Sequence, residues 1–170
     1  MKAVLVIDML NDFVKKDAPL EVPTAREITE NIKTLIEQHR KKDNKIIYVA
    51  DRHRKNDKEF SQYPPHAIKG TEGARIIDEL SPKEEDIIIE KRRFSAFYGT
   101  DLDLTLRENN ISELIITGIL TNICVLYTTA DARMRDYEVK VPRDCVTTNN
   151  KKINEFALNQ MENVLGAEVI

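Results

Sequence analysis

Three reactive side chains, Asp8, Lys91 and Cys124, could together catalyse acyl transfer from an amide. A cysteine thiolate is a nucleophile, a carboxylate can remove the thiol proton, and an ammonium group can stabilise negative charge in the transition state. The three form a nucleophile, a base and an electrostatic partner without a histidine. Each also has an ordinary alternative: a buried cysteine, a turn-capping carboxylate and a solvated lysine.

A second group, Asp51, His53 and His66, has the composition of a metal site. Asp51 and His53 are two residues apart, so in an extended segment both side chains project to the same side. Two imidazoles and one carboxylate leave coordination positions open to water or substrate, and they suit zinc, iron or manganese. The short motif also occurs without a metal, so it does not assign the site by itself.

The remaining cysteine and histidines indicate no further site. Cys145 lies far from Cys124 in sequence, and no CxxC pair is present, so neither a disulfide framework nor a thiolate zinc site is expected. We therefore predict a structural role for Cys145, a solvated position for His39 and a cytoplasmic location for the protein.

Length and charge exclude several other classes. A chain of 170 residues predicts one domain, residues 1–170, with a core that needs no disulfide. A net charge of -3 lacks the basic excess typical of nucleic-acid binding, so no nucleic-acid partner is expected. The apolar runs are far shorter than the roughly 20 residues that span a bilayer, so no membrane association is expected either.

The elements that must position these residues alternate along the chain. Short apolar segments typical of buried parallel strands occupy residues 3–7, 46–50, 87–89, 114–117, 138–141 and 167–170. Helices are predicted after Thr24, where Glu27 completes a capping box, after Thr100 and Thr121, and over residues 153–161. This alternation predicts an α/β fold, a three-layer doubly wound domain with a mainly parallel six-stranded sheet.

Such sheets bind ligands where the carboxyl ends of their strands meet. Asp8 follows the first predicted strand, Asp51 and His53 follow the second, Lys91 follows the third and Cys124 follows the fourth. The fold therefore predicts that these side chains converge on one rim. Cys124 is also expected near a helix N-terminus, where the helix dipole favours a thiolate.

With these residues in place, the sequence resembles the isochorismatase-like cysteine hydrolases, and among them the nicotinamidases, also called pyrazinamidases. The matching motifs follow one another along nearly the whole chain, and their order makes the resemblance specific. They cover residues 6–13, 51–53, 63–66, 70–74, 91–97, 117–125 and 130–132.

The resemblance implies a role for each candidate residue. Asp8 would be the base, Lys91 its catalytic partner and Cys124 the nucleophile. A single divalent metal ion, with zinc expected first and iron or manganese as alternatives, would be held by Asp51, His53 and His66. The backbone N–H groups of Leu120 and Cys124, beside a cis peptide near Ile119, would form the oxyanion hole. Three aromatic residues would enclose the substrate ring, namely Phe13, Tyr63 and Phe94.

By this resemblance the protein converts nicotinamide to nicotinate and ammonia through a thioester on Cys124. The expected partners are a small amide substrate and further copies of the chain in a homodimer or homotetramer. Isochorismatases proper usually lack the cysteine and the metal ligands, which favours amide hydrolysis over enol-ether cleavage. Departures from the nicotinamidase pattern lie in the substrate pocket, at Tyr63, Ala67, Asn122 and Ile123. Hydrolysis of another small amide, as in carbamoylsarcosine-type amidases, and a non-catalytic ligand-binding role are the alternatives.

Overall fold

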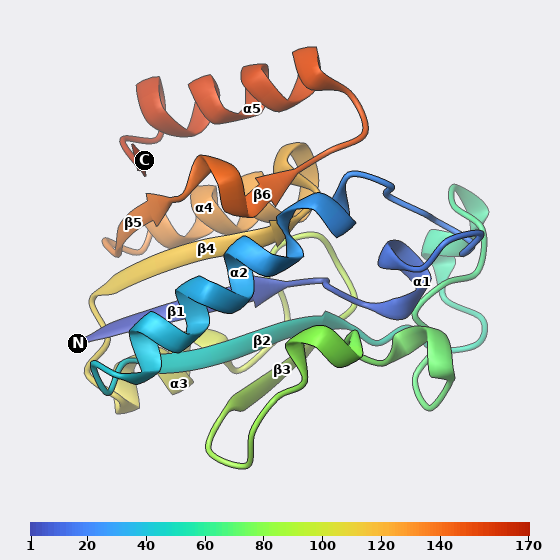
Figure 1. Cartoon of the computed structure of the whole chain (residues 1–170), viewed down its shortest axis with the longest axis horizontal. Coiled ribbons are helices and arrows are strands. Elements are labelled where there is room, and N and C mark those ends of the chain that lie inside the picture. The colour runs from blue at the N-terminus through green and yellow to red at the C-terminus, as the bar shows by residue number, and fades with distance from the viewer.

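The computed structural model describes residues 1–170, with a parallel β-sheet between helices (Figure 1). Seven strands form the sheet in the order β3-β2-β1-β4-β5-β7, and β6 pairs with β4. The strands are β1 (Lys2–Ile7), β2 (Lys45–Asp51), β3 (Ile87–Lys91), β4 (Glu113–Ile119), β5 (Glu138–Val141), β6 (Val146–Thr147) and β7 (Glu168–Val169). The helices are α1 (Asn11–Val14), α2 (Ala25–Arg40), α3 (Leu102–Glu108), α4 (Leu126–Arg133) and α5 (Lys151–Asn163).

The middle strands are almost continuously apolar because both of their faces are covered. Every residue of β1 from Ala3 to Ile7 is buried, and so is every residue of β4 from Leu114 to Ile119. Val6 of β1 lies opposite Tyr48 of β2 on one side and Thr117 of β4 on the other, in parallel register. A strand buried on both faces shows no apolar and polar alternation, and this pattern correctly predicted the central strands.

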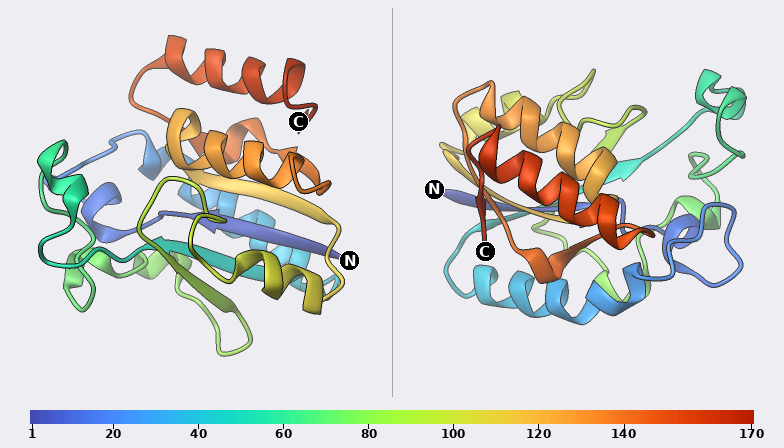
Figure 2. Two further views of the ribbon diagram at one scale, coloured as in Figure 1. Left: turned by 180° about the vertical axis from the view of Figure 1, so that it is seen from behind. Right: turned by 90° about the horizontal axis from the view of Figure 1, so that it is seen from above.

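Alternate residues of β1 point into two separate cores. Leu5 and Ile7 pack in a core with side chains of α3, α4 and α5, whereas Val4 and Val6 pack in another with side chains of α2. The two views of Figure 2 show α2 on one face of the sheet and the C-terminal helices on the other. The predicted three-layer α/β architecture is therefore confirmed.

The sequence pattern did not predict one of the strands, β6. β6 has only two residues, and it pairs with the end of β4, Val146 beside Gly118 and Thr147 beside Ile119. Two residues are too few to show a periodic pattern. The sheet consequently has seven strands where six were predicted.

The capping box predicted at the start of α2 is wrong. Thr24 accepts no side-chain cap hydrogen bond. Its hydroxyl instead donates to the carbonyl oxygen of Thr148 at 3.4 Å, in the segment after β6. The Thr24 hydroxyl thus forms a tertiary hydrogen bond, whereas the local pattern predicted that it would cap the helix. α2 nevertheless begins at the expected place, because Ile28, Ile32 and Ile36 form its buried face.

α5 buries only some of its apolar side chains. Ala157 and Met161 are buried, whereas Ile153 and Phe156 are 44% and 64% exposed. The helix is capped by Asn150, whose side-chain oxygen accepts hydrogen bonds from two backbone N–H groups of the first turn.

No helix of the protein combines the length and apolar character needed to cross a membrane.

Gly118 sets how closely β4 approaches β1, and it provides a test of the packing. Its φ is +103°, and a Cβ atom there would lie 2.0 Å from the carbonyl oxygen of Ile7. We expect Gly118→Ala to lower the free energy of unfolding by more than about 2 kcal/mol, since both the dihedral and the contact are unfavourable. Urea unfolding of the purified variant measures this loss.

Gly70→Ala is the matched control. Gly70 also has a positive φ, +87°, but no heavy atom lies within 4 Å of the position that its Cβ would take. In this variant the free energy of unfolding should fall only by the cost of placing alanine at a positive φ, about 1 kcal/mol. Equal losses in the two variants would contradict the steric explanation.

Candidate active site

The ammonium group of Lys91 lies at the centre of the site. Its Nζ is 2.8 Å from Asp8 Oδ2, 2.6 Å from Asp51 Oδ1 and 3.5 Å from Cys124 Sγ. The Lys91 side chain is fully buried, so it is not the solvated lysine of the alternative interpretation. The structure therefore brings together the three residues proposed for catalysis and joins them to the first proposed metal ligand.

Asp8 is held by backbone as well as by Lys91. It follows β1 with a φ of 53°, and its N–H donates to the carbonyl oxygen of Val49 at 2.9 Å. Its Oδ1 accepts from the N–H of Asp51 at 2.9 Å. These bonds direct the carboxylate across the end of the sheet toward Cys124, instead of into an isolated turn.

Cys124 lies in a π-helical turn, Thr121–Val125, between β4 and α4. The peptide bond between Ile119 and Leu120 is cis, at the place that the resemblance indicated. The N–H of Leu120 donates no hydrogen bond within the protein, so it is free to act as a donor to a ligand.

Burial and neighbouring charges set the proton positions. Burial, followed by the charge of Asp51, raises the pKa of Asp8 to about 6 in spite of Lys91. Burial also raises the pKa of the Cys124 thiol well above its usual value, although the Lys91 ammonium opposes this. The resting cysteine is therefore a thiol, and the thiolate expected from the helix N-terminus alone is not the resting form.

Lys91 keeps its charge in this environment. Burial lowers the pKa of Lys91, but the carboxylates of Asp51 and Asp8 outweigh burial and raise it well above the usual value. Burial raises the pKa of Asp51, but the Lys91 ammonium outweighs burial, and the pKa of this carboxyl is lowered. An ammonium between two carboxylates is thus the stable arrangement at neutral pH.

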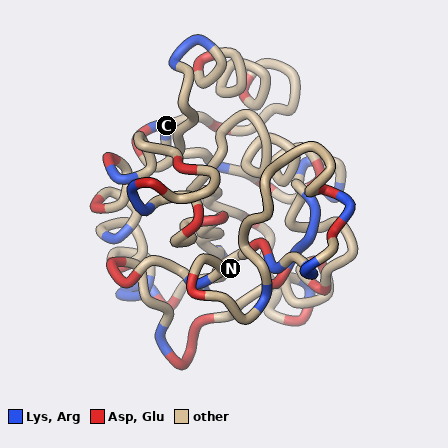
Figure 3. Tube along the Cα trace, turned by 90° about the vertical axis from the view of Figure 1, so that its right-hand side faces the viewer, with Lys and Arg blue, Asp and Glu red and all other residues tan.

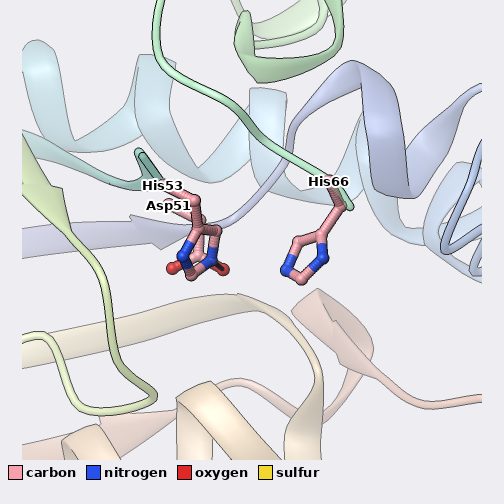
Figure 4. A group of neighbouring side chains, drawn as sticks. All are labelled: Asp51, His53 and His66. Carbon is pink, nitrogen blue, oxygen red and sulfur yellow. Dashed lines mark ion pairs between the residues drawn. The ribbon is translucent and has the colours of Figure 1, made fainter. Parts of the chain in front are cut away.

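The three proposed metal ligands come together beside this group (Figure 4). Ligand atoms of Asp51, His53 and His66 lie within 4.8 Å of one another, and all three residues are buried. His53 Nε2 is 3.6 Å from Asp51 Oδ2, and both ring nitrogens of His53 are buried without a hydrogen bond. A buried unpaired Nε2 that faces a carboxylate fits a divalent metal ion, which would take its lone pair.

A clamp of backbone bonds brings His66 to His53 across a long loop. The N–H of His53 donates to the carbonyl oxygen of Ala67, and the N–H of Lys69 donates to that of His53, each at 2.9 Å. The carboxylate of Asp12 accepts from the N–H of Ala67 at 2.8 Å. A Cβ at Gly73 would lie 2.1 Å from that carboxylate, so glycine is needed for the approach.

Protein acceptors face the outer nitrogen of each imidazole. His66 Nδ1 is 2.7 Å from the carbonyl oxygen of Pro64, and because a carbonyl only accepts, Nδ1 carries the proton and Nε2 has the free lone pair. His53 Nδ1 lies 3.3 Å from Asp57 Oδ2, and neither atom has a hydrogen-bond partner elsewhere. Both rings are thereby oriented to offer Nε2 as a ligand.

Asp57 was not singled out from the sequence, and it supports His53 from behind. Its side chain is buried, and Arg93 Nη1 lies 3.0 Å from its Oδ1. Although burial opposes it, the N–H of Glu59, then His53 and Arg93, hold the pKa of Asp57 at about 2. Within a charged loop, neither residue type nor spacing distinguishes Asp57 from its neighbours.

A cavity of about 320 Å³ opens onto Cys124 and Asp8. The three aromatic residues predicted to enclose the substrate, Phe13, Tyr63 and Phe94, all line it. Residues of its wall that sequence reasoning missed include Leu20, Val22, Glu59 and Asn149, which come from loops without a recognisable motif. Of these, Glu59 approaches one of the proposed metal ligands, with Oε1 3.9 Å from His66 Nε2.

The residues without a predicted role lie apart from the site. Cys145 is buried, and burial raises the pKa of its thiol to about 12. His39 is partly buried on α2, where its Nδ1 lies 3.0 Å from the side-chain nitrogen of Asn44. Neither residue lines the cavity.

Comparison with known proteins gives one consistent match. The family model described as Isochorismatase domain matches residues 2–170. An uncharacterized isochorismatase family protein of Bacillus subtilis is 37% identical, over 99% of this chain and 98% of the relative. The crystal structure of a pyrazinamidase/nicotinamidase from Streptococcus mutans is 35% identical, covers 100% of both chains and superposes with a TM-score of 0.95.

Two further similar structures are named as amidases of different substrates. A pyrazinamidase of Pyrococcus horikoshii in complex with zinc is 30% identical, with a TM-score of 0.93 over 99% of this chain and 98% of that one. An N-carbamoylsarcosine amidase of Thermoplasma acidophilum is 34% identical, with a TM-score of 0.90 over 99% of this chain and 94% of that one. Similarity alone therefore does not select the amide.

The contact between Asp57 and His53 predicts an effect on metal affinity. Asp57→Asn keeps the size of the side chain but removes the charge that faces His53 Nδ1. The dissociation constant for zinc should therefore rise by about tenfold or more. Competition with a chromogenic chelator measures the dissociation constant without an activity assay.

Asp86→Asn is the matched control for that variant. Asp86 is also a buried carboxylate paired with an arginine, Arg40, but the pair contacts none of the metal ligands. Its replacement should leave zinc affinity unchanged. A similar loss in both variants, or in neither, would show that Asp57 does not orient His53.

Proposed function

The chain belongs to the isochorismatase family, and from this membership and the geometry of its site we propose that it hydrolyses a small neutral aromatic amide. The favoured reaction converts nicotinamide and water to nicotinate and ammonia through a thioester on Cys124. The observation that carries the proposal is the Cys124 thiol, 3.5 Å from Lys91 Nζ, which lines an aromatic-walled cavity together with Asp8.

Acylation begins with proton transfer from Cys124 to Asp8. With a pKa of about 6, Asp8 is ionised at neutral pH and basic enough to take the thiol proton as sulfur attacks the amide carbon. The Lys91 ammonium, 3.5 Å from Sγ, stabilises the negative charge on sulfur. A separate base is not required, because Lys91 Nζ lies 2.8 Å from the carboxylate and 3.5 Å from the thiol, and both groups line the same cavity.

The same carboxylate then serves the second half of the reaction. The tetrahedral oxyanion would accept from the N–H groups of Leu120 and Cys124, and Asp8 would return its proton to the departing ammonia. The C–N bond breaks and the acyl group remains on Sγ as a thioester. Asp8 next takes a proton from water, hydroxide adds to the thioester, and the carboxylic acid leaves as the thiol is regenerated.

Asp51, His53 and His66 would hold the metal, for which zinc is the first candidate. When bound, the ion would supply a Lewis-acidic position for a ring nitrogen or a water molecule beside the cavity. The chain's own contribution is to enclose the ring between Phe13, Tyr63 and Phe94, which fixes the carboxamide next to Cys124.

The charge of the cavity favours nicotinamide over the amides that carry a carboxylate. Its lining side chains include four acids, Asp8, Glu21, Asp51 and Glu59, and no lysine or arginine. Lys91 behind them is already paired with two carboxylates. Outside the metal position, a carboxylate such as that of N-carbamoylsarcosine would therefore meet no cationic side chain and would be desolvated without a partner.

Replacing the nucleophile tests the covalent route. Cys124→Ala should reduce ammonia release from nicotinamide to the uncatalysed background, since no other thiol lines the cavity. Its metal content, measured by elemental analysis, should equal that of the wild type. Cys145→Ala is the control and should keep its activity. Turnover retained by Cys124→Ala would rule the proposal out.

A substrate series tests the preference for a neutral amide. Nicotinamide and pyrazinamide should exceed N-carbamoylsarcosine in kcat/KM by about a hundredfold or more, given the cost of desolvating an unpaired carboxylate. Leu20 lies in the cavity wall, so Leu20→Arg should raise the relative activity on the anionic amide, whereas Leu20→Gln should not. A wild-type preference for N-carbamoylsarcosine would contradict the assignment and favour the carbamoylsarcosine-type alternative.

A further inference from the structure

A second cavity, of about 590 Å³, shares no lining residue with the substrate cavity, has His53 in its wall and is lined largely by cations. It takes no part in the proposed amide hydrolysis. Six basic side chains line it, together with a single carboxylate, that of Glu90. The basic residues are Arg52, Arg54, Lys55, Lys69, Arg92 and Arg93.

This concentration of positive charge is a local feature. The chain as a whole has a net charge of -3, and basic and acidic segments are interspersed along most of the trace (Figure 3). A hollow lined by one sign of charge focuses the electrostatic potential and attracts counter-ions. Like charges gathered there also repel one another, so an anion within the cavity would stabilise the folded protein.

Internal pairing neutralises only part of this charge. Lys69 pairs with Glu90. Arg92 and Arg93 pair with the buried carboxylate of Asp57, at 3.5 Å and 3.0 Å. No carboxylate lies within ion-pair distance of the other three cations, which are Arg52, Arg54 and Lys55.

Arg52 is oriented for a ligand by the backbone. Its Nη1 donates to the carbonyl oxygen of Asp51 at 2.8 Å, which holds the half-buried side chain in place while leaving its other donors free. An arginine fixed in this way, flanked by further cations, can bind phosphate oxygens through two parallel hydrogen bonds. Three unpaired cations suit a ligand with more than one phosphate group.

The rim of the cavity adds an aromatic surface. Tyr98 lines the cavity, is 67% exposed and stacks on no other ring of the protein. Gly99 beside it also lines the cavity and has no side chain. A planar ring attached to a diphosphate could stack on Tyr98 while its phosphates reach the cations.

From these observations we propose that the cavity is a binding site for a diphosphate-bearing small molecule, separate from the amide site. The shared chemistry is the pair of adjacent phosphate groups. A nucleoside diphosphate and inorganic pyrophosphate both carry it, and only the nucleotide would engage Tyr98.

Isothermal titration of the metal-loaded protein with pyrophosphate and with ADP tests the proposal. We expect saturable binding to one site, weakened as salt is raised from 50 to 200 mM because the contacts are ionic. The double variant Arg54→Gln/Lys55→Gln should weaken binding about tenfold or more. The absence of saturable binding of both ligands would overturn the proposal.

The control is Lys33→Gln/Lys42→Gln, which removes the same charge at exposed positions away from the cavity. It should bind both ligands like the wild type, and both double variants should hydrolyse nicotinamide normally if they are folded. Diphosphates also chelate metal ions. Binding of undiminished affinity in Arg54→Gln/Lys55→Gln would therefore arise at the metal centre and would equally overturn the proposal.

Tyr98→Ala separates the two sources of the diphosphate. If ADP binds more tightly than pyrophosphate and the variant removes the difference, the site accepts a nucleotide. If both ligands bind equally and the variant changes neither, the site accepts the inorganic ion. Either result supports a diphosphate site.

Discussion

The buried Lys91 ammonium, shared between Asp8 and Asp51, is the interaction on which the rest of the site depends. A single charge buried at this depth would be strongly unfavourable, and two carboxylates at 2.8 Å and 2.6 Å offset that cost. Removing one member of a buried ion pair typically costs about 3–5 kcal/mol, because its partners are left uncompensated. One cation thus fixes the proposed catalytic base and a proposed metal ligand relative to each other.

The order of the strands explains how this network forms. Across the sheet the order β3-β2-β1-β4 places Lys91, Asp51 and Asp8 at or just after the ends of three neighbouring strands, and Cys124 in the turn that follows the fourth. Parallel strands end on the same edge, so residues more than a hundred positions apart meet without any special loop. The metal site requires more, because His66 comes from a long loop and reaches His53 only through the backbone clamp around Ala67.

This difference explains what could be predicted from the sequence. The apolar strands and the residues that follow them determined the fold and placed Asp8, Lys91 and Cys124 on one rim. His66 was a candidate only by its residue type, and the resemblance supplied Leu120 and the aromatic residues, because loops show no periodicity from which their positions could be inferred. Asp57 and the basic cavity beside His53 depend on contacts between charged side chains far apart in sequence, and such residues look alike on any polar surface. The thiol form of Cys124 was also unpredictable, since it results from burial and not from position on a helix.

The central claim is that amide cleavage proceeds through a covalent acyl group on Cys124. A single-turnover experiment with enzyme in excess over nicotinamide, quenched in acid at successive times and followed by peptide mass spectrometry, tests it directly. A nicotinoyl thioester should appear on the peptide containing Cys124, together with ammonia and before free nicotinate. Simultaneous appearance of ammonia and nicotinate, with Cys124 unmodified at every time, would contradict it.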